Sequence, residues 1–482
     1  MRSRFHLGFF KSMIGLLFGV ILINSACAKE TVDVIIVGAG LAGLSTAYRL
    51  QKAGLTYKIL EMSPHIGGRI RTASYPEQIS AEVGLEEFWE DNPTVDIIRE
   101  LKLPVEKAAS AFSSFVSQGK LLPFVQNTSA GFLASQFSER DLKLFQKWDQ
   151  RMVHSYQRIL QNHRDPEMSA LKNISFSNWM KKESGLSAKL QNFVRIQSEP
   201  EYGTSWTQIS ALEGVAEWHI FSGPGLSSYH VDGGNQKLVN ALADQIGNKN
   251  IRVNTKASFI QSQPNEVKVT ATDLSNFQET EYHGRYVVTT VPLFRLREIQ
   301  FDPPLTPLQN QAIQTQTWGS YFTAHVKLDP AASQFWTVRG QSILPVLTDG
   351  SLGVIYGGSA AVRESGTILL NLLVTGGSAE SFNLRTGSAD QIRIELTQSL
   401  QKLWPGIEKW IKSFEFYPYH PRAIASWPVG RSRFDELSDE MRKPFGRVYF
   451  AGDFTEGTHS NGAAESAIRV VRGIVDRRKS EK

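Results

Sequence analysis

Residues 32–43 read Val-Asp-Val-Ile-Ile-Val-Gly-Ala-Gly-Leu-Ala-Gly, and this stretch decides the fold. Its first half is a run of mostly β-branched residues, which is typical of a parallel strand buried on both faces. In its second half, Gly38 suits a tight turn, Gly40 lets the backbone approach a pyrophosphate, and Gly43 permits close packing of a helix on the strand. The stretch therefore predicts the first strand and turn of a dinucleotide-binding unit.

The residues that follow complete this unit. A helix is predicted through Leu44–Leu50 and a second strand at Lys58–Leu60, which together give a βαβ arrangement. Glu61 ends the second strand, 18 residues beyond Gly43, where an acid can accept hydrogen bonds from both hydroxyls of an adenosine ribose. The free N–H groups at the start of the helix favour phosphate.

The next motif is Gly67-Gly68-Arg69-Ile70-Arg71-Thr72. Together with the preceding acid it resembles the flavin-dependent amine oxidase family, which shares these features with protoporphyrinogen oxidases and phytoene desaturases. The resemblance implies that FAD is the cofactor and that the Gly-Gly-Arg loop lies against its diphosphate and flavin. Arg69 would supply a fixed fork of hydrogen-bond donors.

A second signature lies at the other end of the chain, in Gly446–Asp453 and Ser460–Ile468. It reads as a strand, a turn and the start of a helix. The resemblance implies that Asp453 contacts the ribityl or phosphate part of FAD. It also implies that the small-residue helix lies under the flavin pyrimidine ring, with the backbone N–H of Ala464 near the negative charge of the reduced ring.

A middle segment completes the resemblance, which covers nearly all of residues 32–474. Strands are predicted near 251–254, 267–270 and 286–292. The fold class is α/β: a Rossmann-type FAD-binding domain assembled from three chain segments, with an interleaved α+β substrate domain. The predicted divisions are a signal peptide at 1–28, FAD-binding segments at 29–100, 216–300 and 417–482, a helical substrate insert at 101–215 and a strand-rich insert at 301–416.

The cofactor-binding positions implied by the resemblance are mostly glycines and small residues of these motifs. In chain order they are Gly38, Ala39, Gly40, Leu41, Ala42, Gly43, Glu61, Gly67, Gly68, Arg69, Gly84, Ala257, Val291, Trp427, Gly452, Asp453, Gly462, Ala463 and Ala464.

The chain departs from the family pattern beside the flavin. Ala423 and Ala463 stand where many amine oxidases carry an aromatic cage, and Glu298 stands where a lysine near flavin N5 is expected. Three residues are candidates for the catalytic neighbourhood. Trp427 is a flavin-side wall or a core residue, His459 is a proton relay or a structural histidine, and Glu298 replaces the lysine.

Glu86 and Glu87 are candidate substrate residues. They follow Gly84 in a segment that passes near the flavin edge in the family, and a carboxylate there would bind an ammonium group. The alternative is a solvated acidic turn, so a preference for polyamines stays open.

The leading interpretation is an FAD-dependent oxidoreductase that oxidises a primary or secondary amine, polyamine or amino acid, with O2 or another electron acceptor. Two alternatives remain: a desaturase-like flavoenzyme acting on an apolar carbon framework, and a flavoprotein without catalysis, which the departures from the family pattern suggest. Substrate, oligomeric state and oxygen use stay open.

The N-terminal segment has three cations, an apolar run at about Met13–Ile23 and then small residues, the layout of a secretory signal peptide. Ala26-Cys27-Ala28 fits cleavage before Lys29, which predicts a periplasmic or secreted protein without a stable membrane span. Lipidation of Cys27 and an uncleaved anchor helix are the alternatives.

Charge and cysteine content exclude several other classes. Without residues 1–28 the chain has 49 basic and 47 acidic residues, a balance that gives no electrostatic basis for binding nucleic acid. Cys27 is the single cysteine of the sequence, so an intramolecular disulfide, a cysteine-rich zinc site and a cysteinyl-linked flavin are excluded, and no metal site is predicted.

Overall fold

The glycine-rich stretch forms the predicted strand, turn and helix. In the computed structural model, β1 (Thr31–Val37) leads into α1 (Leu41–Lys52), and β2 (Tyr57–Leu60) returns parallel to β1. The structure describes residues 31–77, 79–107, 114–123, 129–222, 227–358 and 366–481. The predicted signal peptide and Cys27 lie outside these residues.

A mixed sheet built from three distant parts of the chain forms the first half of the molecule. Its strand order is β10-β2-β1-β13-β12-β11-β14, and β22 pairs with the end of β13. The further strands are β10 (Ile251–Arg252), β11 (Thr255–Ser262), β12 (Val267–Asp273), β13 (Glu279–Thr289), β14 (Gln300–Asp302) and β22 (Val448–Phe450). Because β2, β1, β13 and β22 are parallel, this is the predicted Rossmann-type sheet.

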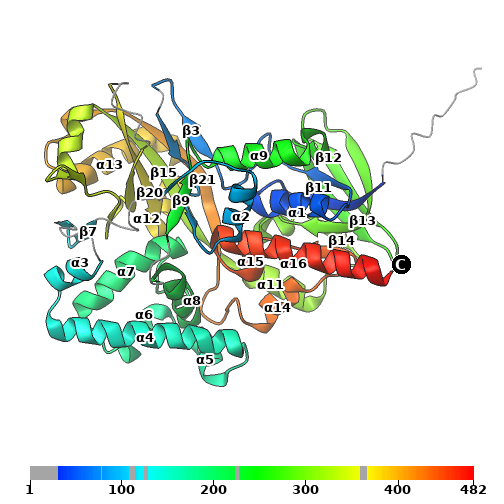
Figure 1. The fold of residues 1–482 in the computed structure, drawn as a ribbon, viewed down its shortest axis with the longest axis horizontal. Helices are drawn as coiled ribbons and strands as arrows, with labels where there is room; N and C mark the ends of the chain where they lie inside the picture. Colours follow the sequence, from blue (N-terminus) through cyan, green and yellow to red (C-terminus); the bar gives the residue numbers. More distant parts are fainter. Residues whose placement is uncertain are drawn as a thin grey trace, which may run out of the picture.

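Three helices pack together beside this sheet. Figure 1 shows α1 between α9 (Gln236–Ile246) and the long C-terminal helix α16 (His459–Ser480). Both α9 and α16 contact α1. Their apolar faces join Val34 and Ile36 of β1 in one fully buried core. The predicted α/β fold class is confirmed.

A second sheet forms the strand-rich part of the substrate half. Its order is β21-β15-β20-β19-β18-β7-β8, with β15 antiparallel to both neighbours. The strands are β7 (Ser114–Ser117), β8 (Lys120–Pro123), β15 (Thr317–Leu328), β18 (Val346–Leu347), β19 (Val354–Gly357), β20 (Ile368–Thr375) and β21 (Ile411–Ser426). Strands from both sides of the middle FAD-binding segment thus pair in one sheet.

Helices form the rest of the substrate half, at the lower left of Figure 1. The longest helix of this insert is α4 (Glu139–Gln161), which Ser138 caps and whose buried face includes Trp148, Met152 and Ile159. The neighbouring helices are α3 (Ser129–Gln136), α5 (Pro166–Ala170), α6 (Phe176–Glu183), α7 (Ala188–Tyr202) and α8 (Ala211–Ser222).

The remaining elements complete the two halves. The strands are β3 (Thr72–Ser74), β4 (Ser80–Glu82), β5 (Phe88–Trp89), β6 (Val105–Lys107), β9 (Ser228–Val231), β16 (Thr337–Val338) and β17 (Gln341–Ser342). The helices are α2 (Pro93–Glu100), α10 (Leu293–Leu296), α11 (Pro307–Thr315), α12 (Gly376–Leu384), α13 (Ala389–Leu403), α14 (Glu436–Arg442) and α15 (Asp453–Glu456). The 3-10 turns are η1 (Leu171–Asn173), η2 (Asn248–Asn250), η3 (Pro330–Phe335), η5 (Thr386–Ser388) and η6 (Ile407–Trp410). Among the described residues, none of the helices combines the length and apolar character that crossing a bilayer requires.

Candidate functional site

The glycine loop between β1 and α1 leaves room for a phosphate group. A Cβ at Gly43 would lie 2.0 Å from the carbonyl oxygen of Gly38, so this residue must be glycine for the helix to pack. By contrast, a Cβ at Gly40 would have no atom within 4 Å and would project into open space. Gly40 is also the N-cap of α1 and supplies no side-chain cap. The loop thus fits the pyrophosphate of a dinucleotide.

Glu61 is tied to the same loop. Its Oε2 accepts a hydrogen bond from the Ala39 N–H at 2.7 Å, and its Oε1 accepts one from the Ser63 N–H at 2.8 Å. Each carboxylate oxygen keeps further lone-pair capacity. The half-buried side chain can therefore accept hydrogen bonds from ribose hydroxyls, as predicted.

An ion pair joins the Gly-Gly-Arg loop to the turn before α16. Arg69 Nη1 and Nη2 donate to Asp453 Oδ2 and Oδ1 at 2.7 and 2.9 Å. Arg69 Nη1 also donates to the carbonyl of Ala423 at 2.5 Å, and Asp453 Oδ2 accepts from the Ala425 N–H at 2.9 Å. The donor fork of Arg69 is thus directed at Asp453, and the two predicted cofactor residues hold each other in place.

The C-terminal helix begins beside this ion pair. A Cβ at Gly462 would lie 1.9 Å from the Gly457 carbonyl oxygen, so the helix start packs closely on the preceding turn. Thr458, the N-cap, makes no side-chain cap to the helix. The first-turn N–H groups of α16 therefore point out of the helix without a cap, which suits a negatively charged flavin edge.

The remaining predicted cofactor positions lie around the same loops. Val291 and Thr290 are the residues nearest to a Cβ at Gly38, and a Cβ at Gly68 would lie 3.3 Å from the Gly40 Cα. The other positions are buried or half-buried within the Rossmann-type half: Leu41, Ala42, Gly67, Gly84, Ala257, Gly452, Ala463 and Ala464. The residues present fit an FAD molecule.

Trp427 is packed in the core. Its side chain is 1% exposed. Its Nε1 donates to Ser438 Oγ at 3.0 Å, and its ring lies under the guanidinium of Arg433. These contacts agree with the core-packing alternative, and a place beside the flavin stays a prediction.

Glu298 lies at the surface, which corrects its predicted catalytic role. Its carboxylate pairs with Lys256 at 3.0 Å and with Arg295 at 2.8 Å. Hydrogen bonds from these two cations lower its pKa. A surface carboxylate neutralised in this way does not serve the site formed by Arg69 and Asp453.

The small residues at the positions of the family's aromatic cage are buried. Ala423 is 2% exposed and Ala463 is 6% exposed. Both positions carry a methyl group in place of an aromatic ring. Tyr321 and Tyr356, from β15 and β19, are partly exposed aromatic groups near the acidic residues described next.

We use the name acidic cluster for three residues, Glu86, Glu87 and Glu201. Each is partly exposed, and burial raises the pKa of each, for Glu201 to about 7. Burial raises the pKa of Tyr356, and the charges of all three carboxyls raise it further, so Tyr356 is a shared neighbour of the cluster. Glu86 Oε1 also accepts a hydrogen bond from Asn371 Nδ2 at 2.6 Å. The two predicted substrate residues are thus not a solvated turn, because protein surrounds both carboxyls.

An electrostatic interaction links the acidic cluster to the start of α16. In opposition to burial, the charge of His459 lowers the pKa of Glu201. Tyr321 is one of the groups that influence the pKa of Arg69. His459 opens α16, and its Nε2 lies 3.2 Å from Glu217 Oε2. Sequence reasoning missed Glu201 and left Glu217 unnamed, since both are single acids in ordinary helical stretches without a motif.

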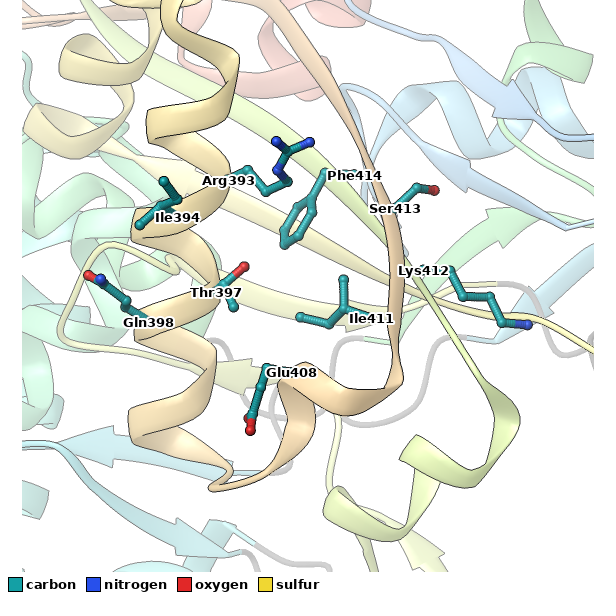
Figure 2. A pocket seen from close by; sticks show the side chains of 9 residues that line it. All are labelled: Arg393, Ile394, Thr397, Gln398, Glu408, Ile411, Lys412, Ser413 and Phe414. Carbon is teal, nitrogen blue, oxygen red and sulfur yellow. The ribbon is translucent and has the colours of Figure 1, made fainter.

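A separate surface depression of about 490 Å³ lies on the substrate half. Figure 2 shows side chains of α13 facing those at the start of β21, among them Arg393, Thr397, Ile411 and Phe414. Its lining includes none of the predicted site residues, and we assign it no part in the chemistry.

Comparison with known families gives a match across most of the chain. The family described as flavin containing amine oxidoreductase matches residues 41–475. Polyamine oxidase 1 of Zea mays is 25% identical over 470 residues, which cover 92% of this chain and 89% of the maize protein. An L-amino-acid oxidase of Sistrurus catenatus edwardsii is 24% identical, with 90% of this chain and 84% of the snake protein covered.

Solved structures show the same fold. Wild-type putrescine oxidase bound to putrescine superposes with a TM-score of 0.78 at 20% identity, covering 93% of this chain and 99% of the other. Cyclohexylamine oxidase from Brevibacterium oxydans IH-35A has a TM-score of 0.75 at 18% identity, covering 93% of this chain and 100% of the other.

Proposed function

The chain belongs to the flavin-containing amine oxidoreductase family, and on this premise we propose that it oxidises an amine that carries a second positive charge, such as a diamine or polyamine. The observation that carries the proposal is the acidic cluster of Glu86, Glu87 and Glu201, which is held within the protein beside His459. Carboxyl groups there attract a distal ammonium group.

The cofactor supplies the redox chemistry. When bound, FAD would supply the acceptor for the two electrons of the C–H bond next to the amine. The protein has to hold the amine, keep water away and take up a proton from the ammonium form.

The names of the similar proteins point to two substrate classes. The maize protein is a polyamine oxidase and one structural neighbour is a putrescine oxidase, whereas the snake protein is an L-amino-acid oxidase. An ammonium group nearby favours the ionised form of these carboxyls and is then attracted to them, whereas the carboxylate of an amino acid gains no such attraction. The acidic cluster therefore favours the diamine or polyamine.

A matched set of amines tests the proposal. We expect 1,4-diaminobutane to bleach the flavin absorbance under anaerobic conditions at lower concentration than butylamine, which lacks the second ammonium group. Glu201→Gln should weaken the response to the diamine and leave that to butylamine nearly unchanged. Readmission of air then shows whether O2 is the acceptor. Equal responses to both amines would disprove the role of the second charge.

Flavin bands that no amine bleaches would support the alternative of a non-catalytic flavoprotein. The buried Ala423 and Ala463 at the cage positions are the observation that keeps this alternative under test.

We also propose that the protein is exported. The support is the sequence of residues 1–28, with its cations, apolar run and small residues before Lys29. Mass spectrometry of the mature N-terminus distinguishes the routes: a start at Lys29 means cleavage after Ala28, an acylated Cys27 means a lipid anchor, and an intact Met1 contradicts export by cleavage.

A further inference from the structure

A buried group of charges joins the helical insert to the C-terminal part of the chain. Arg433 donates from Nε to Glu213 Oε2 at 2.8 Å and from its backbone N–H to Glu213 Oε1 at 2.8 Å. The same guanidinium is also paired with Glu217. The side chains of Glu213, Glu217 and Arg433 are 3, 2 and 5% exposed. Such burial is costly unless every charge has a partner.

Glu217 extends this group to the start of α16. Thr458 Oγ1 donates to Glu217 Oε1 at 2.5 Å, and His459 Nε2 donates to Glu217 Oε2 at 3.2 Å. Both oxygens of Glu217 are therefore bound by the segment that runs from Asp453 into α16. The imidazole has one defined orientation relative to the helix.

The backbone of His459 is also constrained. Its φ is +71°, a left-handed conformation that costs a residue other than glycine energy. Such a conformation persists where the surrounding contacts determine it. The hydrogen bond to Glu217 is one of these contacts.

The contact with Glu217 favours the protonated imidazole. Although burial opposes it, the charge of Arg433 and the hydrogen bonds from His459 and Thr458 lower the pKa of Glu217 to about 2. This carboxylate is therefore ionised, and an imidazolium at its Oε2 is a favourable partner. The charged groups that face His459 are Glu217 from α8, Glu201 from α7 and Arg433 from the segment before α14. Desolvation lowers the pKa of His459, but the hydrogen bond and charge of Glu217, together with the charge of Glu201, raise it overall against the opposing charge of Arg433.

We propose that Glu217 is a positioning residue that holds His459 as an imidazolium at the start of α16, where its fixed positive charge stabilises the reduced form of the bound flavin. The resemblance to the family puts this helix start at the pyrimidine ring, and Asp453, six residues before His459, is held by Arg69. Reduction increases the negative charge on that ring. A cation at the uncapped helix start therefore favours reduction, in the same direction as the helix dipole.

The proposal gives the helical insert a role in the redox properties of the other half. Glu217 lies on α8, whereas the residue it orients opens the helix that contacts α1 in the Rossmann-type half. It requires bound FAD but no particular amine, so it is independent of the proposed substrate class.

The test compares two buried carboxyls of the same charge group in the holoenzyme. We would measure the reduction potential of bound FAD against a reference dye, and the NMR titration of the His459 ring, in Glu217→Gln and in the matched control Glu213→Gln. Glu213 contacts Arg433, whereas the carboxylate that contacts His459 is Glu217. We expect Glu217→Gln to make the potential more negative and to move the His459 titration to lower pH, while Glu213→Gln stays near wild type. His459→Gln gives the full shift of the potential, and combining it with Glu217→Gln adds nothing further.

An unchanged potential and an unchanged His459 titration in folded Glu217→Gln would overturn the proposal. Equal shifts in the two carboxyl variants would also overturn it, because the effect would then belong to the whole charge group. If Glu217→Gln does not fold, His459→Gln alone decides: a more negative potential supports the proposal and an unchanged one rejects it.

Discussion

Arg69 and Asp453, 384 residues apart in the sequence, form a two-pronged ion pair with N–O distances of 2.7 and 2.9 Å. Asp453 is almost completely buried, whereas the Arg69 side chain is 36% exposed. The ion pair closes the site, since it joins the Gly-Gly-Arg loop to the turn before α16 and, through Ala423, to the end of β21.

Removal of the charge of Asp453 should therefore loosen the site as well as the fold. We expect Asp453→Asn to lower the free energy of unfolding by about 2 kcal/mol, less than for a fully buried pair because solvent reaches Arg69. FAD occupancy of the purified protein should fall too. Thermal unfolding and the ratio of flavin to protein absorbance measure the two effects.

The control is Asp96→Asn, which breaks the ion pair with Arg99 on the surface of α2, where both side chains are mostly exposed. This variant should match the wild type in stability and flavin content. A loss of the same size in both variants would show that the Arg69–Asp453 pair has no special role.

The sequence predicted the parts of the site that local rules determine. The strand, glycine turn and helix around Gly40, and the acid Glu61, follow from spacing and β-branched composition, and all appear where they were expected. The parallel sheet followed from the resemblance. These features depend on residues close together in the chain or on a motif with a fixed geometry.

The surroundings of Trp427 and Glu298 could not be predicted from the sequence. A motif gives Trp427 and Glu298 a position in the chain but not their surroundings, and the structure puts the first in the core and the second in a surface ion pair. Glu201 and Glu217 were missed for the opposite reason: each gains its role from segments hundreds of residues away, such as Thr458 and His459.

Two glycines of the first loop should respond differently to alanine. A Cβ at Gly40 meets open space, and its backbone φ of −75° suits any residue. Gly40→Ala should therefore leave the stability of the flavin-free protein nearly unchanged but weaken FAD binding about tenfold or more, because the methyl group takes up phosphate space. Gly43→Ala should instead destabilise the protein by about 1–3 kcal/mol, because its Cβ would meet the Gly38 carbonyl oxygen at 2.0 Å.

Thermal unfolding of flavin-free protein and a fluorescence titration with FAD separate these effects. If Gly40→Ala bound FAD as tightly as the wild type, the phosphate would not lie at this loop.

Stability should depend on pH through Glu201. Burial raises the pKa of this carboxyl from 4.5 to about 7, so the folded protein keeps its proton at a pH where the unfolded chain has lost it. The stabilisation is complete below pH 4.5 and is lost as the pH rises to 7. Compared with Glu201→Gln, the wild type should therefore lose about 2 kcal/mol over this range, since part of the side chain keeps access to solvent.

Urea unfolding of both proteins between pH 4 and pH 8 measures the difference. Glu183→Gln, at an exposed position on α6, should run parallel to the wild type at every pH. A Glu201→Gln curve that also runs parallel to the wild type would mean that Glu201 ionises as an ordinary surface carboxyl.

Glu298 offers a test of the position where the family carries a lysine. Glu298→Lys replaces the attractions to Lys256 and Arg295 by repulsions. Because these pairs lie at the surface, the free energy of unfolding should fall by at most about 1 kcal/mol. It should not change the rate at which the reduced flavin is reoxidised in air, because the new ammonium group points to solvent. Stopped-flow reoxidation of the wild type, Glu298→Gln and Glu298→Lys checks this. A clear acceleration in the lysine variant alone would place this residue beside the flavin, and the surface ion pair would then not describe the enzyme with its cofactor bound.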